Sequence, residues 1–303
     1  MAEKLIVILG PTASGKTRLA AQLAYDLHGE IISADSRQVY KNMNIGTGKD
    51  LNQYIVHGRQ IPYHLIDVLE PQNEFNLFEF QSRFYMIFGD LTEKKILPVL
   101  VGGTGLYLES VLKEYDMPPS PINEECRSNL SGKTKEELQQ ILRALKPCLH
   151  NNTDLEDSGR LIRAIEIEQA RSIKNKDQQK KPQIDAMVFG IKWERAALRQ
   201  RIKIRLEERL AEGMVREVAD LHSAGLSWEK LESFGLEYRF ISQYLQDKIT
   251  FEEMKKGLTI AIGQFAKRQE TWFRRMEKKG VLINWLQSDD YPLLKESVMK
   301  FLR

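Results

Sequence analysis

The sequence predicts an α/β fold in which a parallel sheet is flanked by helices and a helical domain is inserted in the middle of the chain. Apolar segments typical of buried strands alternate with amphipathic helical patterns through the first hundred residues. This alternation is typical of a parallel sheet covered by helices on both faces. With 303 residues, 42% hydrophobic and 29% charged, the chain is long enough for a full core and a second, smaller domain.

Periodicity and turn residues place the expected elements along the chain. The first hundred residues should contain strands at 4–9, 30–34, 63–68 and 97–101 and helices at 15–28 and 76–94. We expect later elements to be a strand at 186–191, helices from residue 194 onward and a last strand at 281–286. Three prolines between residues 118 and 121 predict a domain boundary. We therefore expect a core of residues 1–120 and 186–303 and a helical insertion of residues 121–185, with a charged loop at 174–181.

The composition and its distribution along the chain limit the classes of ligand and compartment that the sequence supports. The net charge is only +3, but residues 160–209 contain 14 basic and 7 acidic side chains. This stretch is either a surface for a polyanion or simply the solvated face of helices. Cys126, Cys148 and the five histidines lack metal-ligand spacing, so free thiols and no zinc site are expected. Without a membrane-spanning apolar run or a visible signal peptide, a cytoplasmic protein that does not bind membranes is expected.

The most specific motif is a glycine-rich loop between the first predicted strand and the first predicted helix. It matches the phosphate-binding pattern G-x-x-x-x-G-K-[ST] in full and consists of Gly10, Pro11, Thr12, Ala13, Ser14, Gly15, Lys16 and Thr17. Backbone N–H groups of such a loop, together with the positive end of the following helix, form an anion-binding nest. Lys16 adds a point charge for phosphate oxygens, and the Thr17 hydroxyl is placed to bind Mg²⁺.

Two further strand ends carry polar or small residues. The strand at 30–34 is followed by Asp35, Ser36, Arg37 and Gln38. If this strand lies next to the first, the Asp35 carboxylate could accept a proton from a nucleophile, position a water on Mg²⁺ or merely cap a turn. The strand at 97–101 ends in Gly102-Gly103-Thr104, where ATP hydrolases usually have a metal-holding acid. Because only Asp67 competes for that role, routine ATP hydrolysis is disfavoured.

Basic side chains recur at helical spacing in the second half of the chain. Arg160 and Arg163 share one helix face, and so do Arg201 and Arg205. Arginine pairs suit phosphate because each guanidinium can form two parallel hydrogen bonds, although ion pairs with nearby glutamates would explain the same pattern. Residues 264–275 mix aromatic and basic side chains, which is typical of a helix packed on a core and also of a base-stacking surface.

Taken together, these motifs resemble the tRNA dimethylallyltransferase family in order and spacing. The resemblance covers nearly the whole chain and rests on residues 10–17, Ile32–Tyr40, Asn44–Lys49, His64–Asp67, Val101–Tyr107, Arg160–Glu166 and Ala266–Arg274. It implies a P-loop NTPase-like sheet with a helical insertion domain that contacts the tRNA anticodon loop. Because the chain stops at Arg303 without a Cys/His finger, it is similar to the bacterial form, and a monomer is expected.

The resemblance also implies a reaction and its site residues. A dimethylallyl group would pass from dimethylallyl diphosphate to N6 of the adenosine on the 3′ side of the tRNA anticodon, and diphosphate would leave. The phosphate loop, with Mg²⁺ on Thr17, would hold this diphosphate in place of ATP. Catalytic roles are implied for Asp35 as general base, for Thr104, and for one arginine of Arg201 and Arg205, taken as Arg205. Contacts with tRNA are implied for Asp35, Ser36, Arg37, Gln38, Thr104, Arg127, Gly159, Arg160, Leu161, Ile162 and Arg163.

The chain departs from the family pattern at three places. Family members commonly have Gly-Thr-Ala-Lys-Pro at Gly46–Asp50, Gln at Gly159, and Gly-Tyr-Arg at Phe234–Arg239. Three other functions stay open: a transferase that prenylates free adenine nucleotides, an ATP-dependent small-molecule kinase, and a non-catalytic RNA-binding protein. The helical insertion favours tRNA over a free nucleotide, because a nucleotide needs no such arm.

Overall fold

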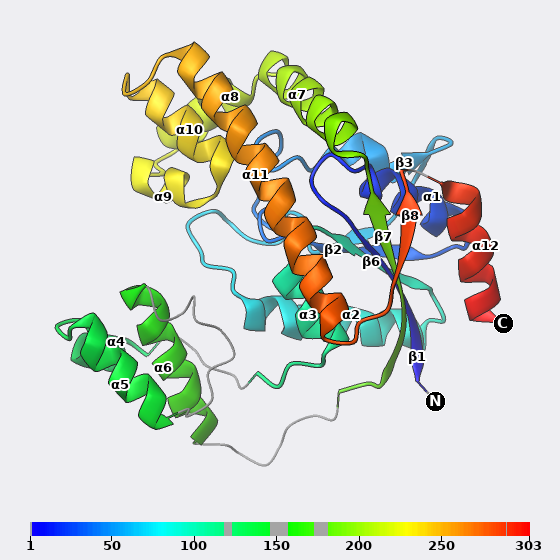
Figure 1. Cartoon of the computed structure of the whole chain (residues 1–303), viewed down its shortest axis with the longest axis horizontal. Coiled ribbons are helices and arrows are strands. Elements are labelled where there is room, and N and C mark those ends of the chain that lie inside the picture. Colours follow the sequence, from blue (N-terminus) through cyan, green and yellow to red (C-terminus); the bar gives the residue numbers. More distant parts are fainter. Residues whose placement is uncertain (1, 118–122, 146–156, 173–180, 289) are drawn as a thin grey trace. The chain divides into compact units, whose positions relative to one another are not determined.

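The chain divides into two compact units (Figure 1). The computed structural model describes residues 2–117, 123–145, 157–172, 181–288 and 290–303. The core unit comprises Met1–Glu114 and Pro182–Arg303, and the insertion unit comprises Tyr115–Lys181. Pro118, Pro119, Pro121, Cys148 and residues 174–180 of the expected charged loop lie outside the described residues.

A six-stranded sheet forms the centre of the core unit. Its order is β5-β2-β6-β1-β7-β8, and every neighbouring pair is parallel. The strands are β1 (Glu3–Leu9), β2 (Glu30–Ala34), β5 (Tyr63–His64), β6 (Pro98–Gly102), β7 (Ile184–Lys192) and β8 (Ile283–Gln287). Residues Leu5–Leu9 of β1 are completely buried because the strand lies inside the sheet with both faces covered. This double burial explains its unbroken apolar sequence.

Helices cover both faces of this sheet (Figure 1). On one face, α1 (Lys16–Asp26) and α12 (Tyr291–Leu302) pack on side chains such as Ile6, Ile8 and Val99. On the other, α2 (Leu77–Glu93), α3 (Gly105–Leu112) and the end of α11 (Phe251–Lys278) pack on Leu5 and Val7. Because successive side chains of a strand point to opposite faces, the side chains of β1 belong alternately to two hydrophobic clusters, one on each face of the sheet.

A group of helices continues from one end of the sheet (Figure 1). It consists of α7 (Arg195–Ala211), α8 (Met214–Ser223), α9 (Trp228–Ser233), α10 (Leu236–Leu245) and the first part of α11. Thr250 and Glu253 form a capping box that starts α11. Because its early residues pack in this group and Phe273 packs on the sheet, α11 joins the two parts of the core unit.

The structure corrects several expectations. The strand predicted at 63–68 contains only Tyr63 and His64, because Leu65 and Asp67 have left-handed backbone conformations that break the ladder. The condition that the strand at 30–34 lies next to the first strand is not met, since β6 lies between β2 and β1. The sequence pattern also missed α3, the 3-10 turn Leu51–Tyr54 and the short hairpin of β3 (Ile55–Val56) and β4 (Arg59–Gln60).

The insertion unit has a small core of its own. It contains α4 (Glu124–Leu130), α5 (Lys135–Leu145) and α6 (Ser158–Ser172), packed around Leu138, Leu142, Leu161 and Ile165. Cys126 is a free thiol at the edge of this core. Among the described residues of both units, no helix combines the length and apolar character that a bilayer crossing requires.

Candidate active site

The phosphate loop lies at the carboxyl end of β1 and leads directly into α1. Ala13 and Gly15 have left-handed conformations, with φ of 62° and 86°, that curve the chain into the helix. Two side chains from the later half of the sequence hold the loop's carbonyl groups. The Trp193 indole N–H donates to the Ser14 carbonyl at 2.9 Å, and Arg201 Nε donates to the Ala13 carbonyl at 2.8 Å. With these carbonyls held, the loop has the shape that an anion-binding nest requires.

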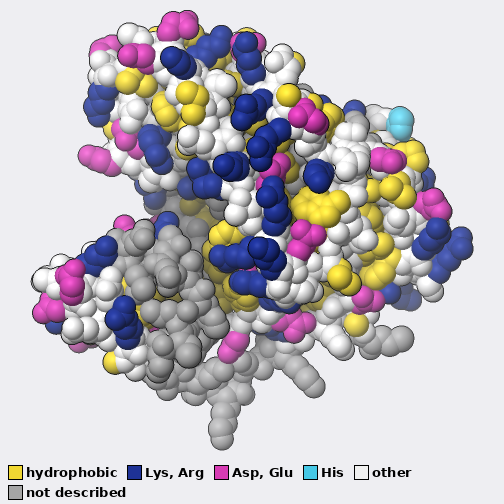
Figure 2. Space-filling model, in the orientation of Figure 1, with side chains coloured by type: hydrophobic (Ala, Val, Ile, Leu, Met, Phe, Trp, Pro, Cys, Tyr) yellow, Lys and Arg dark blue, Asp and Glu magenta, His cyan; other side chains and the backbone are white. Residues whose placement is uncertain are grey.

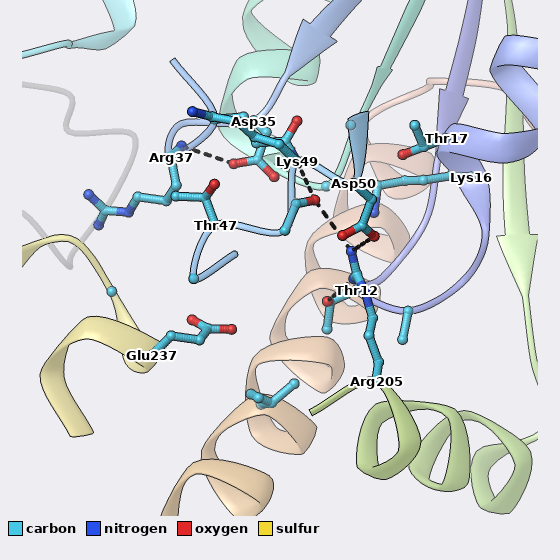
Figure 3. Close-up of a pocket in the computed structure, with 18 of the residues that line it drawn as sticks. Thr12, Lys16, Thr17, Asp35, Arg37, Thr47, Lys49, Asp50, Arg205 and Glu237 are labelled. Carbon is cyan, nitrogen blue, oxygen red and sulfur yellow. Dashed lines mark hydrogen bonds and ion pairs between the residues drawn. The ribbon is translucent and has the colours of Figure 1, made fainter. Parts of the chain in front are cut away.

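A cavity of about 1120 Å³ opens beside this loop (Figure 3). It is lined by the loop, the ends of β2 and β6, the segment 44–54, and helices α7, α10 and α11. Of the residues expected to act, the cavity is lined by Thr12, Ala13, Gly15, Lys16, Thr17, Asp35, Ser36, Arg37, Gln38, Thr104 and Arg205. Gly10, Pro11 and Ser14 are buried behind them and build the loop.

Asp35 and Thr104 meet at the ends of β2 and β6. Asp35 Oδ1 accepts a hydrogen bond from the Arg37 N–H at 2.9 Å, so the carboxylate caps a turn and lines the cavity at once. Thr104 Oγ1 accepts from the Ser36 N–H at 3.1 Å. A Cβ on Gly102 would overlap the Ala34 carbonyl oxygen, so glycine allows this close approach of the two strand ends. Asp35 follows β2 and the phosphate loop follows β1, and both line the cavity although β6 lies between the two strands.

Lys16 is the cation of the phosphate loop, and its side chain lines the cavity. Its ammonium donates to the Pro11 carbonyl at 3.3 Å. Burial lowers the pKa of Lys16 to about 8, while the nearby Asp35 charge acts in the opposite direction. The positive charge of Lys16 is thus poorly hydrated, which favours an anionic ligand.

The structure distinguishes the two arginines that the sequence left equivalent. Arg201 lies 4.2 Å over the Trp193 ring and supports the loop's backbone. Arg205, one turn later, reaches Thr12 Oγ1 at 3.5 Å and forms an ion pair with Asp50. Arg209 follows at the same spacing, with Nη2 4.0 Å from Asp50. Figure 3 shows Arg205 directed from α7 toward Thr12 and Asp50.

Gln269 on α11 is a site residue that sequence reasoning missed. Its Oε1 accepts from the Thr12 N–H at 2.8 Å, and its Nε2 donates to the Gly103 carbonyl at 2.9 Å. One buried amide therefore joins the phosphate loop to the β6 loop. The motif that contains Gln269 was visible in the sequence, but nothing in its spacing pointed to these partners.

Lys49 is a buried cation that forms an ion pair with the partly exposed Asp67. The Lys49 ammonium also donates to the Tyr40 carbonyl at 2.6 Å and to Asn44 Oδ1 at 3.0 Å, and only 1% of the side chain is exposed. Asp67 is engaged in this ion pair and is not among the residues that line the cavity, which disfavours a role as the metal-holding acid of an ATP hydrolase.

Apolar side chains of α3, α7 and α11 line part of the cavity and are called its apolar wall here: Leu106, Ile204, Ile262, Phe265 and Trp272. The aromatic residues of the segment 264–275 therefore serve two purposes. Phe273 is completely buried in the core, whereas Phe265 and Trp272 line the cavity. Such a wall beside a phosphate site suits a ligand with both an anionic and an apolar end.

The insertion unit carries the remaining expected contacts. Arg127 Nε and Arg163 Nη1 each donate to the Glu166 carboxylate at 2.9 Å. Burial alone would raise the pKa of Glu166, but these hydrogen bonds lower it below its usual value. Gly159 and Arg160 are exposed, Ile162 is half-buried, and the Leu161 side chain is completely buried in the unit's core. A contact at Leu161 would therefore use its backbone.

A parallel sheet with a phosphate loop at the carboxyl end of β1 and a cavity beside that loop defines a protein of the P-loop NTPase-like class. Two family comparisons agree with this assignment. The IPP transferase family matches residues 38–276, and the isopentenyl transferase family matches residues 3–64. The chain belongs to the IPP transferase family, whose members are prenyltransferases.

Individual relatives cover the chain almost completely. The tRNA dimethylallyltransferase 1 of Syntrophus aciditrophicus is 54% identical over 100% of both chains. The tRNA dimethylallyltransferase 2 of Treponema denticola is 51% identical over 93% of this chain and 95% of its own. Among solved structures, the tRNA isopentenylpyrophosphate transferase of Bacillus halodurans has a TM-score of 0.70 at 30% identity, over 99% of this chain and 95% of its own. A eukaryotic dimethylallyltransferase at 22% identity shares the fold, with a TM-score of 0.68.

The lowered pKa of Lys16 predicts a pH dependence of anion binding. Inorganic diphosphate should bind wild type more tightly than Lys16→Met at pH 7, and this difference should shrink as the pH rises above about 8. Comparing the two proteins cancels the titration of diphosphate itself. The free energy of unfolding should rise between pH 8 and 10.5, because the unfolded chain binds more protons at this group there. Calorimetric titrations from pH 6.5 to 9.5 measure the difference, and a constant difference would contradict the assignment.

Proposed function

We propose that this protein transfers a dimethylallyl group from dimethylallyl diphosphate to N6 of the adenosine on the 3′ side of the tRNA anticodon. The observation that carries the proposal is that the phosphate loop, Asp35 and an apolar wall line the same cavity. The names of the full-length relatives support transfer to tRNA over transfer to free nucleotides or phosphorylation by ATP. We place the reaction in the cytoplasm, where unmodified tRNA is found.

The donor is held by complementary parts of the cavity. Backbone N–H groups of the loop, Lys16 and Arg205 bind the diphosphate, and the prenyl chain lies along the wall that includes Ile204 and Phe265. As the bond between the prenyl C1 and the diphosphate oxygen breaks, the leaving group gains negative charge. Positive groups fixed in advance around it lower the barrier because they need no reorganisation during the reaction.

Proton transfer balances the step. The adenosine N6 forms the new bond to the prenyl C1, and the electron pair of the broken C–O bond leaves with diphosphate. Asp35 takes one N6 proton, which prevents a positive charge from remaining on the nitrogen. Thr104, which accepts from the Ser36 N–H, holds the turn that carries Asp35 in place.

Mg²⁺ fits the donor set of this cavity. Mg²⁺ prefers oxygen ligands and usually keeps waters and substrate phosphates around it, with one or two protein ligands. The described residues contain no cluster of three or more acidic, His or Cys side chains that could hold a metal by themselves. Thr17 at the start of α1 would supply the protein hydroxyl. When bound, the ion would neutralise charge on the leaving diphosphate.

Recognition of tRNA would use both units. In the core unit, Asp35 to Gln38 line the cavity that the unstacked base would enter. In the insertion unit, Arg127, Arg160 and Arg163 offer guanidinium groups for phosphates. On α11, Lys267, Arg268 and Arg274 are exposed. Figure 2 shows Lys and Arg side chains gathered on this face of the core unit.

A donor-and-acceptor assay tests the proposed function. Purified protein with Mg²⁺ and labelled dimethylallyl diphosphate should label unmodified tRNA and release one diphosphate for each group transferred. AMP and ATP serve as competing acceptors in parallel reactions. Labelling of AMP in place of tRNA, or consumption of ATP without the prenyl donor, would overturn the proposal.

The affinity for tRNA should depend steeply on salt. Because phosphate contacts release counterions, the logarithm of the association constant should fall linearly with the logarithm of salt concentration. Arg160→Ala should weaken binding and reduce the magnitude of this slope by about one, since its exposed side chain would lose one phosphate contact. Filter binding over a series of KCl concentrations measures the slope. A flat response of the wild type would contradict a tRNA surface built on basic side chains.

A further inference from the structure

We propose that Asp50 is an internal counter-ion that competes with diphosphate for Arg205 and Arg209 and thereby speeds release of the product. The inference rests on the proposed function, because it assigns the ligand of the loop as a diphosphate.

The geometry of Asp50 supports this assignment. Its Oδ2 forms an ion pair with Arg205 Nη2 and accepts from Gln53 Nε2 at 3.1 Å, while Oδ1 lies 4.0 Å from Arg209 Nη2. The carboxylate lines the same cavity as Lys16 and Thr12 and is drawn next to Lys16 in Figure 3. Arg205 is therefore neutralised at the place where an incoming phosphate would meet it.

The backbone around Asp50 is shaped to admit the two arginines. Gly48 has a φ of +65°, and a Cβ there would overlap the Arg209 guanidinium and lie 2.8 Å from Arg205 Nη2. Asp50 itself has a φ of 43°, which proline cannot adopt because its ring fixes φ near −65°. Gly48 and Asp50 thus belong to one arrangement: the glycine makes room for Arg209, and the aspartate pairs with both guanidinium groups.

Asp50 contributes charge more than position. Arg205 is also held by the Gly48 carbonyl at 3.3 Å and by Thr12 Oγ1 at 3.5 Å. These two acceptors would keep the guanidinium directed toward the loop without the carboxylate. Removing the negative charge leaves Arg205 without its acidic partner, whereas Arg209 keeps Glu237, whose Oε1 lies 3.7 Å from Arg209 Nη1. The cavity becomes more positive beside the phosphate loop, which strengthens the attraction for diphosphate.

The test is calorimetric titration of inorganic diphosphate with Mg²⁺ and without tRNA. Asp50→Asn, which is nearly isosteric, should bind diphosphate about ten- to a hundredfold more tightly than wild type. In steady-state assays it should show correspondingly stronger product inhibition. Asp50→Ala should shift affinity in the same direction, which guards against an effect peculiar to the asparagine amide. Asp220→Asn, which removes an Arg–Asp pair on the exposed face of α8 with 69% of the Asp220 side chain exposed, is the matched control and should bind like wild type.

A double-mutant cycle identifies the partner. Arg205→Met should weaken diphosphate binding. The gain from Asp50→Asn should be smaller in this background, because one of the two cations for which Asp50 and diphosphate compete is gone. Unchanged or weaker diphosphate binding by Asp50→Asn, with wild-type binding intact, would overturn the counter-ion role and leave the proposed function standing. Failure of the wild type to bind diphosphate at all would overturn the proposed function first.

Discussion

Replacing Asp35 by asparagine is expected to lower the rate of prenyl transfer by about 10²–10⁴-fold, the usual contribution of a general base. The amide cannot take the N6 proton, whereas its oxygen can still accept from the Arg37 N–H as the carboxylate does at 2.9 Å. The turn should therefore persist. Single-turnover rates with saturating donor and tRNA measure the chemical step separately from binding.

Binding measurements provide the control for Asp35. Asp35→Asn should retain the wild-type affinity for tRNA and an unchanged melting temperature. Asp185→Asn in β7 makes the same chemical change away from the cavity, where Asp185 forms a half-exposed ion pair with Lys4. This variant should leave the rate unaltered. Wild-type transfer by Asp35→Asn would mean that another group accepts the proton.

Lys16→Met is expected to reduce transfer by about 10²–10³-fold, because a fixed positive charge is lost where the leaving group becomes negative. Thermal stability should be kept or raised at pH 7, since burial of this ammonium lowers its pKa and its charged form opposes folding. The rate under single-turnover conditions and the melting temperature are the two measurements.

Lys49→Met is the matched comparison, because it places the same substitution in the same cavity. Lys49 donates to Tyr40, Asn44 and Asp67, so its removal leaves a carboxylate and a carbonyl without their cation. We expect this variant to lose about 1–3 kcal/mol of stability, the usual cost of leaving buried hydrogen-bonding groups without a partner. If Lys16→Met were instead the destabilised variant, the roles of the two lysines would be reversed.

The sheet was largely predictable because its strands are buried on both faces and read as apolar runs. The position of β6 between β1 and β2 was not predictable, since strand order depends on which faces the helices cover and not on the strands' own sequences. Local pattern also failed at Leu65 and Asp67, where left-handed backbone ends β5 although the sequence remains apolar and β-like.

The parts of the site that are formed by a contiguous segment of the chain were predictable from the sequence. The phosphate loop is contiguous, and Asp35 follows a strand directly, so both were visible in the sequence. The pairs that complete the cavity join distant residues: Gln269 lies 257 positions from Thr12, and Arg205 lies 155 positions from Asp50. No single-sequence pattern encodes such contacts. The spacing of Arg201 and Arg205 continues to Arg209, and this was the one signal that could have identified the third arginine.

The discontinuous core unit sets an order for folding during synthesis. Strand β1 pairs with β7 over seven residues, from Glu3 with Ile184 to Leu9 with Gly190, so one edge of the first strand made must wait for a strand made much later. The whole insertion unit, Tyr115–Lys181, leaves the ribosome in between and can fold around its own core first. The loop at the N-terminus acquires its Gln269 partner only when residue 269 of 303 has emerged. The first motif to be translated is thus among the last parts of the protein to become competent for binding.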